Sequence, residues 1–218
     1  MTSKLDSVTR NIHSAAANAG RKATDITLVA VSKTKSSNAI TPILDQGHRV
    51  FGENRIQEAA GKWPELRALY SQVELHLIGP LQSNKVRQAL RLFDVIETID
   101  RPKLARAIAR ISQEENISCQ YYIQINVGRE AQKAGIDPEE ADSFITLCRD
   151  ELKLPVIGLM CIPPADQDPA PYFLQLKEIA KRNGLKKLSM GMSGDYQVAI
   201  RCGATSVRVG TAIFGARS

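Results

Sequence analysis

The chain has 218 residues, of which 43% are hydrophobic and 24% are charged, and its formal net charge is +6. This composition is typical of a folded globular protein and excludes a disordered or low-complexity chain. Cys119, Cys148, Cys161 and Cys202 lack the spacing of a metal site or a disulfide framework, which favours reduced thiols and predicts a cytoplasmic protein without a bound metal. No segment reaches the roughly 20 apolar residues that a membrane-spanning helix needs, and the polar N-terminal segment does not resemble a secretory signal.

The positive charge raises the question of a nucleic-acid partner. Its basic residues occur in short clusters, of which 101–110 is the densest. There Leu104, Ile108 and Ile111 fall on one face of a helical pattern and the arginines fall elsewhere, which is typical of the solvated side of an amphipathic helix. The five Phe and five Tyr are not interleaved with basic residues as in single-strand binding platforms. We therefore expect no nucleic-acid partner.

Helical and strand patterns alternate along the whole chain. A helical pattern over 3–19 comes first. The predicted strands are 26–32, 49–53, 73–79, 94–99, 120–127, 155–160, 187–191 and 206–210. The predicted helices between them are 37–46, 54–70, 82–92, 101–116, 138–152, 170–183 and 194–202. Strands this apolar are buried on both faces, which indicates a parallel sheet with the helices outside it.

Eight strands alternating with helices predict an α/β fold, a single-domain (β/α)8 TIM barrel over residues 1–218. A doubly wound sheet would give the same alternation. Because a helix precedes the first strand and little chain follows the eighth, we expect the N-terminal helix to occupy the position of the last helix. In such a barrel the functional residues lie where the strands end, at the carboxyl rim.

Lys33 follows the first predicted strand, in "LVAVSKTK" (28–35). Partial burial at the rim would lower the pKa of its amine, and a free amine forms an imine with an aldehyde. The alternatives are a lysine that reaches solvent or one that pairs with a rim carboxylate such as Glu53.

Two turns rich in small residues predict a phosphate site. Gly210 and Thr211 follow the eighth strand, and Ser193 lies in "MGMSGD" (190–195) after the seventh. Barrel phosphate sites commonly use these two turns, although the glycines could serve tight turns alone. The strand alternation directs Arg208 inward, where it needs an acceptor such as a phosphate, a carboxylate or a ring nitrogen.

Other polar residues near the rim have more ordinary interpretations. Asn54 follows the second strand and is suited to hydrogen-bond a ring substituent. His76 is expected to be a satisfied core histidine, and Trp63 a packing residue. Four glutamates are interpreted as solvated helix faces: Glu58, Glu65, Glu139 and Glu140.

Seven segments, in this order, resemble the pyridoxal phosphate homeostasis protein family. They are "LVAVSKTK" (28–35), "FGENRIQE" (51–58), "HLIGPLQSNK" (76–85), "IQINVGREAQKAGI" (123–136), "GLMCIPP" (158–164), "LSMGMSGDYQVAI" (188–200) and "VRVGTAIFGAR" (207–217). The resemblance covers nearly the whole chain. It implies a fold-type III barrel related to the N-terminal domain of alanine racemase, with pyridoxal 5′-phosphate (PLP) held as an internal aldimine, a Schiff base.

The resemblance also implies roles for individual residues. Lys33 matches the lysine that forms the Schiff base. The phosphate-binding positions are matched by Ser193, Gly210 and Thr211, the ring-nitrogen position by Arg208, and a ring-side position by Asn54. Lys133 matches a second lysine to which we assign no catalytic role. Where the family commonly has two acidic residues, this chain has Gly194 and Asp195, which could reshape the turn.

The function implied is intracellular PLP homeostasis without robust turnover, in a protein that is not an enzyme and has apo-PLP enzymes as recipients. We expect a monomer, because no surface stripe in the sequence indicates a dimer and the pattern forms one whole domain. An arginine at the ring nitrogen keeps the cofactor a poor electron sink. One alternative is a single-domain racemase-like PLP enzyme. Another is a Schiff-base aldolase or phosphosugar barrel without PLP.

Overall fold

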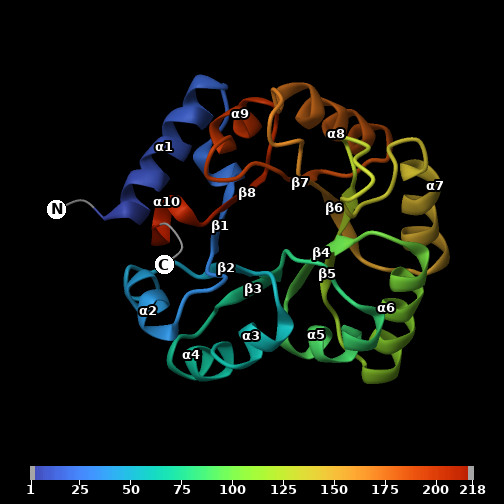
Figure 1. Cartoon of the computed structure of the whole chain (residues 1–218), viewed down its shortest axis with the longest axis horizontal. Coiled ribbons are helices and arrows are strands. Elements are labelled where there is room, and N and C mark those ends of the chain that lie inside the picture. The colour runs from blue at the N-terminus through green and yellow to red at the C-terminus, as the bar shows by residue number, and fades with distance from the viewer. Residues whose placement is uncertain (1–2, 216–218) are drawn as a thin grey trace.

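The computed structural model describes residues 3–215 and contains a closed barrel of eight parallel strands (Figure 1). The strands are β1 (Thr27–Val31), β2 (Val50–Glu53), β3 (Glu74–Leu77), β4 (Val95–Ile99), β5 (Gln120–Ile125), β6 (Val156–Cys161), β7 (Lys187–Ser189) and β8 (Ser206–Val209). Each strand pairs with the next in the chain, and β1 pairs with β8, which closes the ring. The predicted barrel is confirmed, and the open doubly wound sheet is excluded.

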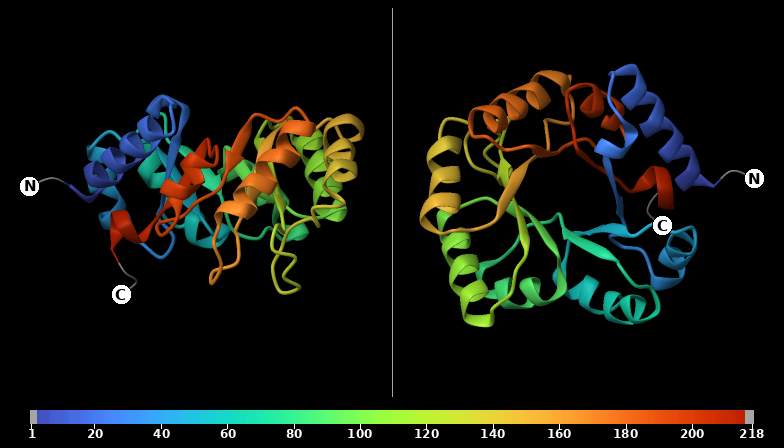
Figure 2. Two further views of the ribbon diagram at one scale, coloured as in Figure 1. Left: turned by 90° about the horizontal axis from the view of Figure 1, so that it is seen from above. Right: turned by 180° about the vertical axis from the view of Figure 1, so that it is seen from behind.

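The helices form an outer ring around the strands (Figures 1 and 2). They are α1 (Lys4–Asn18), α2 (Ser37–Asp45), α3 (Ile56–Ala60), α4 (Trp63–Leu69), α5 (Val86–Leu92), α6 (Pro102–Glu115), α7 (Ala141–Thr146), α8 (Ala170–Arg182), α9 (Tyr196–Arg201) and α10 (Thr211–Phe214). Short 3-10 turns, Ala23–Asp25 and Ser83–Lys85, precede β1 and α5.

Helix α1 packs against α9 and α10, beside the junction of β8 and β1 (Figure 1). Its first turn is closed by a capping box in which the Ser3 hydroxyl accepts from Asp6 N–H and the Asp6 carboxylate accepts from Ser3 N–H. Arg21, just after α1, donates to the Ile200 carbonyl at 2.9 Å and ties this segment to α9. The N-terminal helix therefore takes the position of the last helix of the ring, as predicted.

Two predicted helices differ from the structure. The helix expected over 54–70 is divided into α3 and α4, with Lys62 as the N-cap residue of α4. Pro64 lies in the first turn of α4, where its missing N–H costs nothing, so it favours the start of a new helix. The helix expected over 138–152 begins at Ala141, and its last turn, Leu147–Glu151, widens to a π-helix.

The barrel interior is part apolar and part charged. Val95, Tyr122 and Met160 form a small apolar cluster separate from the large core between strands and helices. His76, Glu97, Ser189 and Arg208, from β3, β4, β7 and β8, are also buried. Because unpaired buried charge is costly, these polar side chains must be paired with one another or with a ligand.

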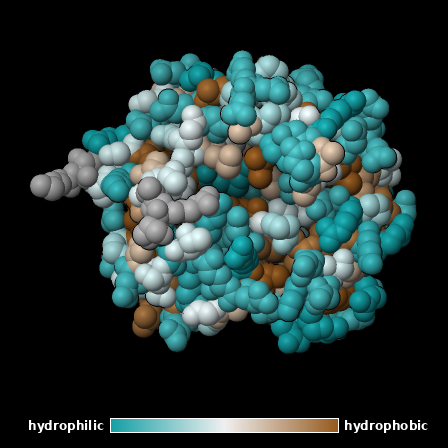
Figure 3. Space-filling model, in the orientation of Figure 1, coloured by the Kyte–Doolittle hydropathy of each residue, from teal (hydrophilic) through white to brown (hydrophobic). Residues whose placement is uncertain are grey.

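The carboxyl end of the barrel carries the longest loops. The segments after β5 and β6 project beyond the rest of the molecule on the side where the described chain ends (Figure 2, left). The face in Figure 3 is hydrophilic at its periphery, with hydrophobic residues visible around the centre of the ring. Within residues 3–215, none of the helices has both the length and the hydrophobicity needed to span a membrane.

Candidate functional site

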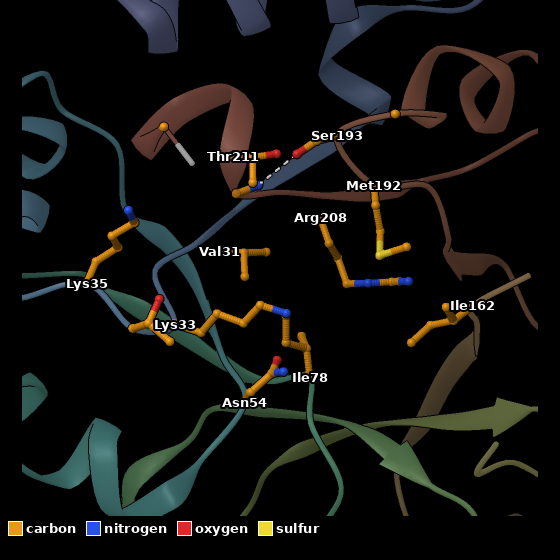
Figure 4. Close-up of a pocket in the computed structure, with 14 residues that line it drawn as sticks. Val31, Lys33, Lys35, Asn54, Ile78, Ile162, Met192, Ser193, Arg208 and Thr211 are labelled. Carbon is orange, nitrogen blue, oxygen red and sulfur yellow. Dashed lines mark hydrogen bonds between the residues drawn. The ribbon is translucent and has the colours of Figure 1, made fainter. Parts of the chain in front are cut away.

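A cavity of about 280 Å³ opens at the carboxyl ends of the strands. Its lining residues come from β1, β8, both ends of α10 and the loops that follow β1, β2, β3, β6, β7 and β8. They are Val31, Lys33, Thr34, Lys35, Asn54, Ile78, Ile162, Met192, Ser193, Gly194, Arg208, Gly210, Thr211 and Gly215 (Figure 4). All six residues predicted from the sequence as a binding site are among them. The structure thus brings together residues that are up to 178 positions apart in the chain.

Lys33 lies in the loop after β1, and its side chain is half-buried. Figure 4 shows it extending into the cavity toward Asn54 and Ile78, whereas the neighbouring Lys35 extends in another direction. The turn after β3 packs closely against the backbone of Asn54, and a Cβ at Gly79 would lie 2.2 Å from the Asn54 carbonyl oxygen. Only glycine allows this close approach.

The two turns predicted to bind phosphate are hydrogen-bonded to each other. Gly210 N–H donates to the Ser193 hydroxyl at 3.2 Å, which joins the turns after β7 and β8 (Figure 4). The Asp195 carboxylate accepts from Met192 N–H at 2.5 Å and closes the turn that contains Ser193. Thr211 begins α10, as the sequence suggested, and its side chain is exposed at the cavity.

Arg208 points into the barrel and is 4% exposed. Its guanidinium donates to the Ser189 hydroxyl at 2.6 Å and to the Cys161 carbonyl at 2.8 Å. The Glu97 carboxylate lies 3.8 Å from it and accepts from the Ser189 hydroxyl at 2.5 Å. The protein therefore supplies the acceptors that an inward arginine requires, a hydroxyl and a backbone carbonyl, and Glu97 balances its charge.

Buried charges continue from Arg208 through the barrel. Glu97 accepts from His76 Nδ1 at 2.6 Å, and His76 Nε2 lies 2.7 Å from Glu74, whose side chain reaches solvent. Burial opposes a charge on His76, but the hydrogen bonds to Glu74 and Glu97 outweigh it and raise its pKa to about 9. Burial likewise opposes the charge of Glu97, yet His76, Arg208 and Ser189 lower its pKa. His76 is thus a paired core histidine, as predicted, and charges alternate in sign along the series.

A second buried group surrounds Glu53, which the sequence suggested as a partner of Lys33. The structure instead pairs Glu53 with Lys62 at 2.9 Å. The same carboxylate oxygen accepts from the Ser32 hydroxyl at 2.5 Å and from Trp63 Nε1 at 3.0 Å. Burial raises the pKa of Glu53, and these donors act against that shift. Trp63 packs on Phe51, as expected of a packing residue, and it also donates a hydrogen bond to Glu53.

Glu58 was wrongly interpreted as part of a solvated helix face. Its carboxylate accepts from Thr34 N–H at 2.6 Å and from Lys62 Nζ at 2.8 Å, so it faces the loop that carries Lys33.

Lys133 lies outside the cavity lining and donates to the Pro163 carbonyl at 3.0 Å, joining the loops after β5 and β6.

Sequence reasoning missed Glu97, Ser189 and Lys62. Glu97 had a detectable signal, because a carboxylate within the apolar strand "DVIETI" needs a buried cation, and Arg208 is another charge within a strand. Ser189 and Lys62 had none, since a serine in a strand and a lysine before a helix are both common at surfaces.

Residues 3–218 match the family described as alanine racemase, N-terminal domain. Among curated proteins, the chain is 41% identical to the pyridoxal phosphate homeostasis protein of Vibrio cholerae serotype O1, over 98% of this chain and 94% of that protein. It is 40% identical to the protein of that name from Escherichia coli K12, over 98% and 95% of the two chains. The chain belongs to the pyridoxal phosphate homeostasis protein family, within the class of alanine racemase N-terminal domain barrels.

Solved structures agree with this assignment. PipY of Synechococcus elongatus PCC7942, in a structure with PLP bound, superposes with a TM-score of 0.80 at 36% identity, over 88% of this chain and 93% of that chain. An alanine racemase of Clostridium difficile has the same barrel, with a TM-score of 0.68 at 16% identity, and this chain covers 56% of it. At that identity the likeness concerns the fold alone.

Proposed function

We propose that this protein binds PLP covalently through Lys33 and serves in intracellular PLP homeostasis rather than as an enzyme. The observation that carries the proposal is that the Lys33 amine, the hydroxyls of Ser193 and Thr211 and the Arg208 guanidinium, paired with Glu97, all lie at a single cavity. When bound, PLP would supply a reactive aldehyde, with which a lysine amine condenses reversibly to an imine with loss of water. The family's name and the PLP-bound PipY structure support the same cofactor.

The donor set fits this cofactor. Ser193 and Thr211, with the backbone N–H groups at the start of α10, are suited to a phosphate. Val31, Ile78 and Ile162 offer apolar walls for a flat ring. Arg208 already has its charge balanced by Glu97, so it suits a neutral ring nitrogen better than a second anion.

The cavity chemistry favours retention of the cofactor over turnover. Among the described residues that line it, only Lys33, Lys35 and Arg208 are titratable. A racemase-like reaction needs proton transfer on both faces of the substrate carbon. Arg208 is not a base at physiological pH, and Lys35 extends in a different direction from Lys33 (Figure 4). This argues against the racemase-like alternative, for which solvent deuterium exchange at the α-carbon of amino acids is the direct test.

We further propose that the protein works in the cytoplasm as a monomer and passes PLP to apo-PLP enzymes. The four cysteines are buried free thiols, which suits a reducing compartment. The exposed large hydrophobic side chains of the described chain, Leu69, Leu174 and Met192, lie on separate elements, which favours a monomer. Size-exclusion chromatography with light scattering tests the oligomeric state.

The decisive experiment for the proposed function is a spectrum of the purified protein with PLP. A visible imine band should form, and borohydride should convert it to a stable adduct that peptide mapping assigns to Lys33 and not to Lys35. Lys33→Ala should lose both the band and the adduct while keeping weaker phosphate-dependent binding. An unchanged band in Lys33→Ala, or an adduct on another lysine, would refute the assignment.

A further inference from the structure

Lys62 is a buried lysine outside the cavity lining, with only 6% of its surface exposed. Its ammonium lies 2.9 Å from Glu53 and 2.8 Å from Glu58. It also donates to the backbone carbonyls of Ser32 and Lys35, each at 3.0 Å. Burying an ammonium is costly unless it is paired and hydrogen-bonded, and the four oxygen atoms around the three N–H donors of Lys62 meet that requirement.

The two carbonyls lie on either side of Lys33 in the sequence. Residues 32–35 form a tight turn in which Lys35 N–H donates to the Ser32 carbonyl at 3.1 Å, and Ser32 N–H is bound to Gly52 of β2. The ammonium of Lys62 therefore bridges both ends of the turn. Lys33 is one of the two residues between those ends, and its side chain extends into the cavity (Figure 4).

Thr34, the residue after Lys33, has a strained backbone. Its φ of 62° lies in the left-handed region, which β-branched residues rarely adopt. Such strain persists only where the surroundings impose it. Here the Thr34 N–H is held at 2.6 Å by Glu58, and Glu58 is itself bound to Lys62.

We propose that Lys62 and Glu58 act as a clamp that fixes the turn 32–35 and so directs the Lys33 amine toward a bound aldehyde; this rests on the proposed function. Both are positioning residues, because they act on the turn and not on the ligand. The clamp reduces the freedom of the Lys33 backbone before any ligand arrives, which favours imine formation over phosphate-only binding.

The test compares Glu58→Ala with Glu65→Ala, an exposed glutamate in the first turn of α4. With PLP as the probe, the ratio of PLP trapped by borohydride on Lys33 to PLP bound without an imine should fall about tenfold in Glu58→Ala, which corresponds to ~1.4 kcal/mol. Affinity for pyridoxine 5′-phosphate, which lacks the aldehyde, should change less than about twofold, as for a surface substitution. Glu65→Ala should match the wild type in both measurements.

Lys62→Met is the second variant and should lower the trapped fraction at least as far as Glu58→Ala. If it fails to fold, Glu58→Ala decides the question, because the Glu58 side chain is partly exposed. A folded Glu58→Ala with the wild-type trapped fraction, or an equal loss in Glu65→Ala, overturns the clamp.

Hydrogen exchange separates this inference from the proposed function. The Thr34 amide should lose at least about tenfold protection in Glu58→Ala without any ligand present, and keep it in Glu65→Ala. If the wild type forms no adduct on Lys33, the proposed function fails, while Thr34 exchange still decides whether the clamp exists. Unchanged Thr34 protection overturns the clamp whatever PLP does.

Discussion

The buried Ser189 and Ser206 hydroxyls provide a matched test of how Arg208 is held. The two residues pair in register on neighbouring strands β7 and β8, at 0% and 2% exposure. The Ser189 hydroxyl accepts from Arg208 and donates to Glu97, whereas the Ser206 hydroxyl has no hydrogen-bond partner among residues 3–215. The same Ser→Ala change therefore removes a bridge between two charges at one position and an unsatisfied group at the other.

The two substitutions should change the free energy of unfolding in different ways. Ser189→Ala loses two hydrogen bonds to charged groups, each worth about 1.5–3 kcal/mol. The attraction between Arg208 and Glu97 at 3.8 Å remains and offsets part of the loss. We expect about 3 kcal/mol of destabilisation, or a midpoint lowered by roughly 6–12 °C for a chain of this size. Ser206→Ala should be neutral or slightly stabilising, because it removes a buried polar group without a partner.

Urea denaturation of both variants, with and without PLP, measures these differences. Ser189→Ala should also weaken PLP retention, because Arg208 loses one of the groups that orient it. Equal effects of the two substitutions would refute the reasoning, since they would show that the bridge contributes nothing beyond packing.

Three further predictions concern the charge series, the phosphate turns and the Asn54 backbone. His76 has a folded-state pKa of about 9 against an ordinary 6.5, so its contribution, about 3 kcal/mol, is fully present below pH 6.5 and is lost as the pH rises through 9. Urea titrations from pH 6 to 10 should show this loss in the wild type and not in His76→Gln. Ser193→Ala should weaken PLP affinity by about tenfold or more without a change in the unfolding midpoint, measured by equilibrium dialysis. Gly79→Ala should displace Asn54 and weaken PLP binding, whereas Gly61→Ala, where a Cβ would meet nothing closer than 3.6 Å, should not.

Much of the fold could be predicted because one physical signal repeats along the chain. Eight apolar β-branched runs separated by amphipathic helices leave few architectures, and all eight strands were located to within a few residues. Pro64 was the available sign that the helix expected over 54–70 divides, since proline favours a first helical turn. The π-helical last turn, Leu147–Glu151, has no comparable sign in the sequence.

The residues that line the cavity could be predicted from the sequence, whereas the buried ion pairs that hold them in place could not. Lys33 and Ser193 follow strands and Arg208 lies near the end of β8. The carboxyl ends of all barrel strands meet at one rim, so such residues lie close together whatever their separation in the chain. Which carboxylate pairs with which cation depends on side-chain geometry across the barrel, which periodicity does not contain. For that reason the sequence does not indicate the ion pair of Glu53 with Lys62, or the contacts of Glu58 with Thr34 and Lys62.

The two buried charge groups bear on what the cavity can do. Glu97 compensates Arg208, and Glu53 and Glu58 compensate Lys62, so the charges of these two groups are paired without a ligand. A ligand then needs little rearrangement of the protein, which favours tight binding. Turnover at the α-carbon would in addition need a group in the cavity that takes up and returns a proton. Glu97, Glu53 and Glu58 are each paired with a cation and none of the three lines the cavity, so none of these three carboxylates is placed to act as that base.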